Sequence, residues 1–155
     1  MSTDISIRKA TANDIPILKQ FEQGIIQAER PYSPIIKPDP TYYHDIEGML
    51  SNPLVDLIVA VVNDKPVACG FARIEQSEHY YTTGQHAYLG MMYVSPEYRR
   101  KGINTMIIEA LKELVAQRGI KELWLEVFSG NESAIKAYEK AGFEHHMIQM
   151  RMSIV

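Results

Sequence analysis

Three consecutive cations and a glycine (Arg99, Arg100, Lys101 and Gly102) stand directly before a run of apolar residues at helical spacing. The first turn of a helix offers N–H groups without intrahelical partners and the positive end of the helix dipole. Because glycine lets a backbone approach a ligand closely or adopt a positive φ, this turn suits a pyrophosphate. A solvated basic turn capped by a glycine is the alternative, and these residues alone leave both interpretations open.

Other anion-binding patterns fit the chain less well. The sequence contains neither G-x-x-x-x-G-K-[ST] nor G-x-G-x-x-G, so a P-loop or a Rossmann phosphate site lacks its glycines. The net charge is −3 and the pI is about 5.9, which argues against a broad surface for nucleic acid or for an anionic membrane. Any anion must therefore be bound by a local group of residues.

The elements that would position this turn can be read from the hydrophobic pattern. Ile5 and Ile7 indicate a short first strand, and Asn13 is the expected N-cap of a first helix. The proline-rich residues 29–40 predict an irregular connection, which a second helix over residues 41–50 follows. Further along, the pattern predicts a hairpin of residues 56–62 and 66–75, a strand at 87–94, a helix ended by Gly119, a strand at 122–127, a helix at 133–141, and a last strand with Ile148, Met150 and Met152.

This order of elements predicts one α/β domain over residues 1–155, with a mixed sheet and helices on both faces. The single cysteine, Cys69, lies in an apolar run and excludes an internal disulfide. The start of the chain has no apolar signal-peptide region, and no apolar run is long enough for a membrane helix. A cytoplasmic location is therefore the expectation.

Two segments resemble the GCN5-related N-acetyltransferase (GNAT) family. The run YVSPEYRRKGINTMIIEAL is similar to its acyl-CoA motif, Arg/Gln-x-x-Gly-x-Gly/Ala, at Arg99, Gly102 and Asn104, although the family has a small residue where Asn104 stands. LWLEVFSGNESAIKAYEKAGFE resembles its second motif, with Asn131 and Tyr138 in the expected order. The order of the other elements also fits, so the resemblance extends over nearly the whole chain.

The resemblance implies a mostly antiparallel central sheet of about seven strands, with a splayed V between the fourth and fifth strands. Acetyl-CoA would lie in this V as the cosubstrate. Backbone groups of Met92, Tyr93 and Val94 would pair with its pantetheine arm, and Asn131 would contact the arm from the other side. The pyrophosphate would be held by backbone N–H groups of the turn, namely Arg99, Arg100, Lys101, Gly102, Ile103, Asn104 and Thr105.

Acetyl transfer to an amine needs a base for the acceptor, a donor for the oxyanion and a proton for the departing thiolate. The resemblance assigns the proton to Tyr138, whose alternative is packing on its helix face. A strand N–H near Met92 or Tyr93 would serve the oxyanion. The strand before the turn has no carboxylate, so Glu126 is the candidate base, with a structural carboxylate or a water relay as alternatives.

The proline-rich connection would form the acceptor side, with Glu29, Arg30 and Tyr32 as the candidate residues. Glu29 would pair with an ammonium and Arg30 with a carboxylate, and solvated charges are the alternative for both. His44, His145 and His146 do not form a convincing metal set, so we expect no metal.

The sequence thus predicts an acetyl-CoA-dependent N-acetyltransferase that acts by direct transfer in a ternary complex. The acceptor would be a primary amine, either a small amine, an amino acid or a peptide N-terminus. The alternatives are a non-catalytic acyl-CoA-binding or sensing domain on the same fold and a nucleotide-binding protein. A homodimer through a sheet edge or the last strand is compatible with the sequence, whereas no nucleic-acid or membrane partner is expected.

Overall fold

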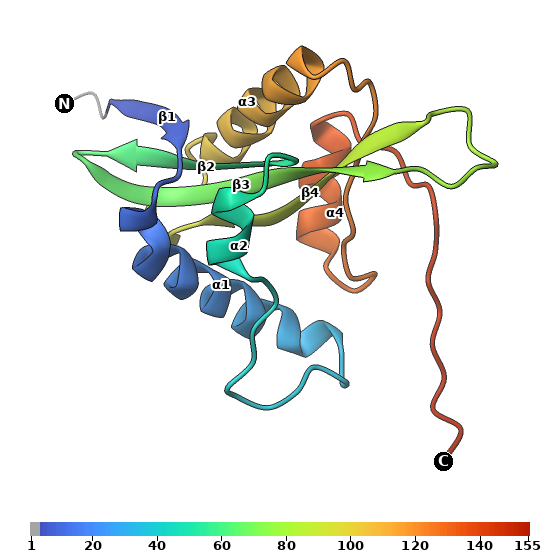
Figure 1. Ribbon diagram of the computed structural model, residues 1–155. Coiled ribbons are helices and arrows are strands. Elements are labelled where there is room, and N and C mark those ends of the chain that lie inside the picture. Colours follow the sequence, from blue (N-terminus) through green and yellow to red (C-terminus); the bar gives the residue numbers. More distant parts are fainter. Residues whose placement is uncertain (1–3) are drawn as a thin grey trace.

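The computed structural model describes residues 4–155. Met1–Thr3, the first residues of the segment in which we expect no signal peptide, lie outside the described residues. Its centre is a sheet with the strand order β1-β2-β3-β4-β5. Helices α1 and α2 cover one face and α3 covers the other (Figure 1). Each face has its own cluster of buried apolar side chains. The expected α/β architecture, with helices on both faces of a mixed sheet, is confirmed.

The first three strands form an antiparallel series. Strand β1 (Ile5–Lys9) pairs with β2 (Val55–Val62), which pairs with β3 (Lys65–Gln76). The turn between β2 and β3 holds Asn63 and Asp64, whose φ angles are 49° and 62°. Positive φ at both central residues is the geometry that two-residue hairpins favour, and Asn and Asp tolerate it better than most residues. The expected hairpin is confirmed.

Strand β4 (Gln85–Val94) continues the antiparallel series and contains an irregularity close to its end. Its register against β3 shifts between the pairs Phe71↔Gly90 and Cys69↔Tyr93, so β4 has an extra residue there. Met91 adopts a φ of 52° at this bulge. Its carbonyl oxygen accepts a hydrogen bond from the buried Cys69 thiol at 3.2 Å.

The sheet ends in a short parallel pair. Strand β5 (Leu123–Trp124) pairs with β4 only at Ala87↔Leu123 and Tyr88↔Trp124, near the beginning of β4. Beyond Tyr88, this edge of β4 has no strand partner in the described part of the chain. The strand predicted over residues 122–127 is therefore paired only at its start. The fourth and fifth strands are thus held together at one end alone, as expected for strands that splay into a V.

The crossover between β4 and β5 runs through η3 (Pro96–Tyr98) and α3 (Ile103–Gln117). Four side chains of α3 are buried against the sheet at intervals of four residues, which is one face of a helix. They are Ile103, Ile107, Leu111 and Val115. Gly119 follows the helix with a φ of 77°, so its predicted role as the residue that ends α3 is confirmed.

The start of the first helix differs from the prediction. A short turn, η1 (Ala12–Asp14), precedes α1 (Ile15–Glu29), and Asn13 lies inside this turn rather than at an N-cap. The Asp14 carboxylate accepts from the Thr11 N–H at 2.7 Å and pairs with Arg8 at 2.7 Å. Asp14 therefore connects the beginning of α1 to β1. The ion pair with Arg8 joins two elements, so a local capping pattern does not predict it.

After α1 come the turn η2 (Arg30–Tyr32), an irregular connection and α2 (Ile46–Ser51). This second helix begins later than the predicted residue 41. The Asp45 side chain caps it by accepting from the Gly48 N–H at 3.1 Å. The extended residues before Asp45 run along α1 instead, where the Thr41 carbonyl accepts from the Gln23 side chain at 2.9 Å.

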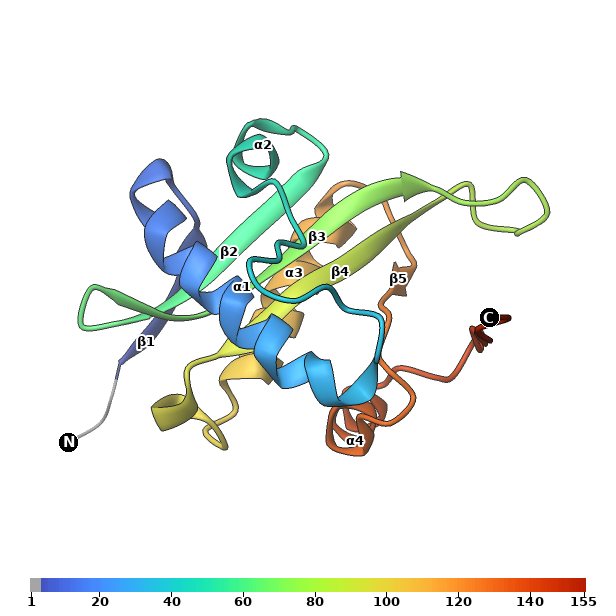
Figure 2. The same ribbon diagram turned by 90° about the horizontal axis from the view of Figure 1, so that it is seen from below.

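The C-terminal third contains α4 (Glu132–Lys140), which Gly142 follows with a φ of 108°, as predicted. The last strand, expected around Ile148, Met150 and Met152, does not form: residues 143–155 belong to no helix or strand. The sheet over residues 4–155 accordingly has five strands instead of about seven. Both views show this C-terminal segment standing away from the rest of the molecule (Figures 1 and 2).

Candidate functional site

The beginning of α3 has donors without partners. Gly102 is its N-cap, with a φ of 77°, and neither a capping side chain nor an acidic residue occupies the first turn. The first bond into the helix runs from the Met106 N–H to the Gly102 carbonyl at 3.1 Å. The N–H groups of Ile103, Asn104 and Thr105 precede this bond, so they have no acceptor within the helix. Three donors thus point out of the positive end of a 15-residue helix.

The cations of the turn have different surroundings. The Arg99 Nε donates to the Val94 carbonyl at 3.0 Å, and its guanidinium lies 5.7 Å from the centre of the Tyr93 ring. The Arg99 N–H also donates to the Pro96 carbonyl at 3.3 Å, so the open donors of the turn begin after Arg99. Arg100 is exposed with a φ of 63°, and Lys101 lies over the Tyr98 ring at 5.4 Å.

These features fit the pyrophosphate of acetyl-CoA. A Cβ added to Gly102 would meet no atom within 4 Å, so the space beside the turn is open to a ligand. Buried Ile103 fixes the turn to the core while Asn104 and Thr105 stay accessible. Donors without partners, two accessible cations and an open approach are what an anion needs, because its charge is then met by both dipole and side chains.

The end of β4 presents backbone to the same region. The Tyr93 ring lies 4.9 Å from the Phe21 ring and against Gly24, where an added Cβ would come within 2.7 Å of it. Met92 turns to the other face, where its sulfur would be 2.8 Å from a Cβ on Gly70. With both side chains packed into the two faces, the backbone edge of Met92, Tyr93 and Val94 is the part left for a ligand.

Helix α4 carries Asn131 and Tyr138. Asn131 is the N-cap, and its side-chain oxygen accepts from the Ala134 N–H at 3.4 Å. The capping role accounts for this oxygen and leaves the amide NH₂ group for other contacts. The Tyr138 ring packs edge-on against Phe143 at 5.9 Å, so it also has the packing role considered from the sequence.

Tyr138 lies close to the carboxylate of Glu29, the last residue of α1. Burial raises the pKa of Tyr138, and the negative charge of Glu29 raises it further. Burial likewise raises the pKa of Glu29, although Tyr43 and His44 oppose this shift. Burial and Glu29 together raise the pKa of Tyr43 to about 12. The structure thus brings a partly buried carboxylate together with two protonated phenols.

Glu126 lies elsewhere on the β4–β5 side. Its side chain is exposed, and it is near Tyr88 of β4, whose pKa is raised by burial and by the Glu126 charge. Trp124, in the same segment, has its ring stacked on His86 at 3.9 Å. Glu126 and Tyr88 therefore form a second carboxylate–phenol pair next to the place where β4 and β5 part.

The other acceptor-side residues have unequal roles. Tyr32 lies against Gly130, where an added Cβ would be 3.2 Å from its ring, so η2 reaches the loop before α4. Arg30 instead donates to the Lys37 carbonyl and to Asp39, both at 2.7 Å. These bonds brace the proline-rich connection and engage the Arg30 guanidinium within the chain.

Sequence reasoning overlooked Glu22. This side chain is buried within α1, and its carboxylate lies 2.8 Å from the His44 Nδ1. The His44 ring packs edge-on against Phe71 at 5.3 Å, so the pair links α1, the connection and the sheet. A glutamate one helical turn after the buried Leu18 was the available signal, since a charged residue on an apolar stripe needs a buried partner.

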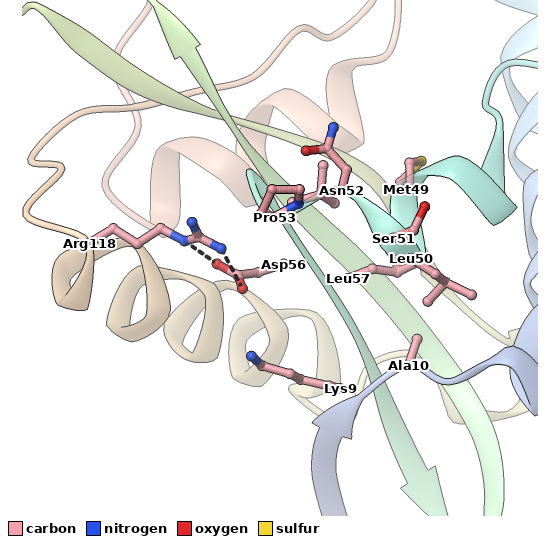
Figure 3. A pocket seen from close by; sticks show the side chains of 11 residues that line it. Lys9, Ala10, Met49, Leu50, Ser51, Asn52, Pro53, Asp56, Leu57 and Arg118 are labelled. Carbon is pink, nitrogen blue, oxygen red and sulfur yellow. Dashed lines mark hydrogen bonds and ion pairs between the residues drawn. The ribbon is translucent and has the colours of Figure 1, made fainter.

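Two surface hollows lie on the side of α2. One, of about 250 Å³, is lined by residues that include Lys9, Asn52 and the ion pair of Asp56 with Arg118 (Figure 3). Arg118 follows the C-terminal end of α3, so a helix length separates this hollow from Gly102. The other, of about 330 Å³, is lined by Tyr43, His44 and Arg73 among others, and so adjoins the acceptor side.

Neither a metal-ligand cluster nor a membrane-spanning helix occurs within residues 4–155. No group of three or more His, Cys, Asp or Glu side chains could hold a metal ion there. Within the same range, no helix has the length and apolar character needed to cross a membrane.

The sequence matches the model of the acetyltransferase (GNAT) family over residues 23–143. The [ribosomal protein bS18]-alanine N-acetyltransferase of Escherichia coli K12 is 39% identical over 56 residues, or 36% of this chain and 38% of that protein. The thialysine N-epsilon-acetyltransferase of Sus scrofa is 30% identical over 101 residues, or 62% of this chain and 59% of that protein. The matches therefore span only 38% and 59% of the length of these relatives.

A solved structure of a predicted acetyltransferase with acetyl-CoA from Clostridium acetobutylicum superposes with a TM-score of 0.73. It is 23% identical, and the superposition covers 97% of this chain and 97% of that one. At this identity the likeness concerns the fold, which is the one expected from the sequence.

Proposed function

The chain belongs to the acetyltransferase (GNAT) family, and on this premise we propose that it transfers an acetyl group from acetyl-CoA to a primary amine. The observation that carries the proposal is the open N-terminus of α3, where three N–H groups, Arg100 and Lys101 are available to a pyrophosphate. Acetyl-CoA would supply the activated acetyl thioester. We place the activity in one domain and in the cytoplasm.

Different residues of the chain would bind the pyrophosphate and the pantetheine arm of acetyl-CoA. The N–H groups of Ile103, Asn104 and Thr105 bind the pyrophosphate, with Gly102 leaving room for it. The open edge of β4 at Met92–Val94 and the amide of Asn131 orient the pantetheine arm from its two sides. None of these N–H groups, strand backbone groups or the Asn131 amide is needed to bind the acceptor, so they would fix the position of the cosubstrate whatever acceptor enters.

Tyr138 is the proposed proton donor to the thiolate that leaves. A raised pKa keeps this phenol protonated at neutral pH, which a donor requires. Cys69 is buried with no exposed surface, and burial raises the pKa of its thiol. A buried, protonated thiol cannot serve as a nucleophile, which favours direct transfer in a ternary complex over an acyl-enzyme.

Two carboxylates are candidates for the acceptor side. Glu29 lies beside Tyr138 and is partly withdrawn from water, so it suits an ammonium that must approach the site. Glu126 is exposed and paired with Tyr88, and we keep it as the proposed base that accepts the amine proton. Tyr32, next to Gly130, would close the acceptor side across from Glu29.

The relatives act on amines of two kinds, an alanine of a ribosomal protein in one case and the epsilon amine of thialysine in the other. The proposed acceptor class is therefore a primary amine, as a peptide N-terminus, an amino acid or a small amine. An alternative is a non-catalytic acyl-CoA-binding or sensing domain, favoured by the lack of a carboxylate on β4.

The test is an acetyl-CoA assay against pooled peptides, amino acids, polyamines and aminoglycosides, read by the mass shift of the acceptor. The enzyme should add one acetyl group and release free CoA. Binding of acetyl-CoA without turnover on any pool would favour the sensing alternative, and absence of both would overturn the proposal.

A further inference from the structure

A histidine is the hydrogen-bond partner of the buried Glu22 carboxylate. The Glu22 side chain is 2% exposed on the buried side of α1, and its Oε2 lies 2.8 Å from the Nδ1 of His44. A buried carboxylate is costly without a hydrogen-bond donor, so the proton of the neutral His44 ring is held on Nδ1 and points at Glu22. This tautomer leaves the His44 Nε2 with a free lone pair.

The Nε2 of His44 is accessible. It takes part in no hydrogen bond or ion pair with residues 4–155, and in that range no buried side-chain nitrogen or oxygen of a buried or half-buried residue lacks a partner. Nε2 is therefore not buried, although the side chain as a whole is only 18% exposed. The ring lines the hollow of about 330 Å³ on the side of α2, so this nitrogen faces a space that a small group can enter.

Aromatic packing holds the His44 ring in this position. The ring lies edge-on to Phe71 at 5.3 Å and to Tyr43 at 6.1 Å. Phe71 lies against Gly90, where an added Cβ would be 2.5 Å from its ring, and Gly90 directly precedes the bulge at Met91. Phe71 therefore connects His44 to the part of β4 that leads into its open backbone edge.

The surroundings of His44 suit an ammonium. The charge of His44 lowers the pKa of Glu29, so the two side chains are neighbours, although no ion pair joins them. Glu29 is also the carboxylate that lies close to Tyr138. An amine between Glu29 and His44 would thus have an anion on one side, a proton acceptor on the other and the proposed acid nearby. The charged or titratable groups that face the ring are Glu22 and Glu29 from α1, Tyr43 and Asp45 from the connection, and Arg73 from β3.

We propose that His44, oriented by Glu22, takes the first proton from the acceptor amine. This inference rests on the proposed acetyl transfer. An alkyl amine has a pKa of about 10.4, so it arrives as an ammonium and must lose a proton before it can attack. Glu29 attracts the ammonium, and the Nε2 of His44 accepts that proton.

The remaining steps then balance. As the C–N bond forms and the C–S bond breaks, a second proton leaves the nitrogen, for which Glu126 stays the proposed acceptor. Tyr138 gives its proton to the thiolate. His44 and Glu126 return their protons to water and Tyr138 regains one, so one proton is released for each ammonium that is acetylated.

A pH profile of kcat/KM for the acceptor, at saturating acetyl-CoA, tests the role of His44. His44→Gln removes the proton acceptor, and we expect kcat/KM to fall by about 10²-fold and the decline at acidic pH to disappear. The Kd of acetyl-CoA should stay unchanged. His79→Gln makes the same replacement in the exposed loop after β3 and should behave like the unmodified chain.

Glu22→Gln tests the positioning residue. Glutamine keeps an oxygen that accepts from Nδ1 but removes the negative charge, which disfavours the imidazolium. The acidic limb of the profile should therefore move to lower pH, by about one unit or more. A merely structural Glu22 would change the Tm and leave the limb in place. An unmoved limb in Glu22→Gln, or full activity of His44→Gln, overturns the proposal.

A measurement on the unmodified chain covers the case in which these variants do not fold. Two-dimensional ¹H–¹⁵N spectra of the histidine rings identify the tautomer, and we expect His44 to carry its proton on Nδ1 at the pH of the assay. A proton on Nε2 at that pH would refute the role as a base. If the unmodified chain acetylates no acceptor pool, both this inference and the proposed function fail, whereas turnover that survives His44→Gln refutes this inference alone.

Discussion

At the scale of single residues, the candidate site consists of carboxylates paired with phenols. Glu29 lies with Tyr43 and Tyr138, and Glu126 lies with Tyr88. In each pair burial is the largest cause of the raised phenol pKa, and the carboxylate adds to it. Desolvation and a negative charge both disfavour a phenolate, so these tyrosines stay protonated at neutral pH.

Replacing Tyr138 with Phe removes the proposed proton donor while keeping the ring packed on Phe143. We expect kcat to fall by about 10²-fold or more, the usual contribution of a general acid, with little change in the Kd of acetyl-CoA. Steady-state assays and calorimetry measure the two quantities. Tyr80→Phe, in the exposed loop after β3, is the control. An unchanged kcat for Tyr138→Phe would assign this tyrosine to packing.

The pH dependence of the activity should also show that Tyr138 acts in its protonated form. Tyr138 acts in its protonated form, and its pKa is raised above the ordinary 10.0, so activity that depends on it is lost only as pH rises through that higher value. An alkaline decline well below pH 10 would point to another group.

Replacing Glu29 with Gln tests whether burial of the Glu29 carboxylate destabilises the folded protein. Because burial raises its pKa above the ordinary 4.5, the ionised side chain disfavours the folded state at pH 7. Below the unfolded-state pKa the carboxyl is neutral in both states, and this penalty is absent. We therefore expect Glu29→Gln to raise Tm by about 2–4 °C at pH 7, and to have little effect near pH 4.

Thermal melts at the two pH values check this difference. Glu113→Gln, on the exposed face of α3, should change Tm little at either pH. If Glu29→Gln lowers Tm at pH 7, the carboxylate is held by favourable contacts and is a structural group.

At the scale of elements, the two ends of α3 offer a matched comparison. Gly102 precedes the helix and Gly119 follows it, both have a φ of 77°, and an added Cβ would meet no atom within 4 Å at either position. Substitution therefore introduces the same backbone strain at both ends, roughly 1–2 kcal/mol, without a steric clash within the chain.

Only Gly102 lies where a pyrophosphate would approach. We expect Gly102→Ala to weaken acetyl-CoA binding on the order of tenfold, or 1.4 kcal/mol, whereas Gly119→Ala should change the affinity little. Calorimetric titration of both variants, with melts to confirm equal stability, measures this. Equal affinities for the two variants would exclude a close approach of phosphate to Gly102.

The elements also show why local patterns predict some features and miss others. The Asn63-Asp64 hairpin, the apolar stripe of α3 and the terminating Gly119 depend on neighbours in sequence, and all were predicted. The start of α1 depends on the contact of Asp14 with Arg8. The length of β5 depends on how far it stays paired with β4. Such contacts between elements are not predicted by the hydrophobic periodicity of the sequence.

In the candidate site, too, features set by neighbours in sequence could be predicted, whereas contacts between distant residues could not. The turn at Gly102 and the cap Asn131 belong to short motifs, and their local geometry could be anticipated. Glu22 with His44, the braced Arg30 and the nearness of Glu29 to Tyr138 join α1 and the proline-rich connection to the rest of the molecule. These pairings are set by the fold as a whole.

At the scale of the whole molecule, acetyl-CoA should stabilise the fold because it would bind α3, β4 and α4 together. A ligand at 100 times its Kd adds about 2.7 kcal/mol, which corresponds to roughly 5–10 °C in Tm for a chain of this size. A thermal-shift assay should show this increase with acetyl-CoA and little with ATP. Stabilisation by ATP alone would favour the nucleotide-binding alternative.

The hydrogen bond from Cys69 to the Met91 carbonyl has one more consequence. This thiol has no exposed surface, and burial raises its pKa, so in the closed structure it is shielded from alkylating reagents. Cys69 packs in one core cluster with Leu18 and Phe21 of α1, so a reagent can reach the sulfur only when the core over the centre of the sheet opens. The rate of alkylation in native buffer therefore reports how often the centre of the sheet opens, and it does so with no engineered label, since the chain has no second cysteine.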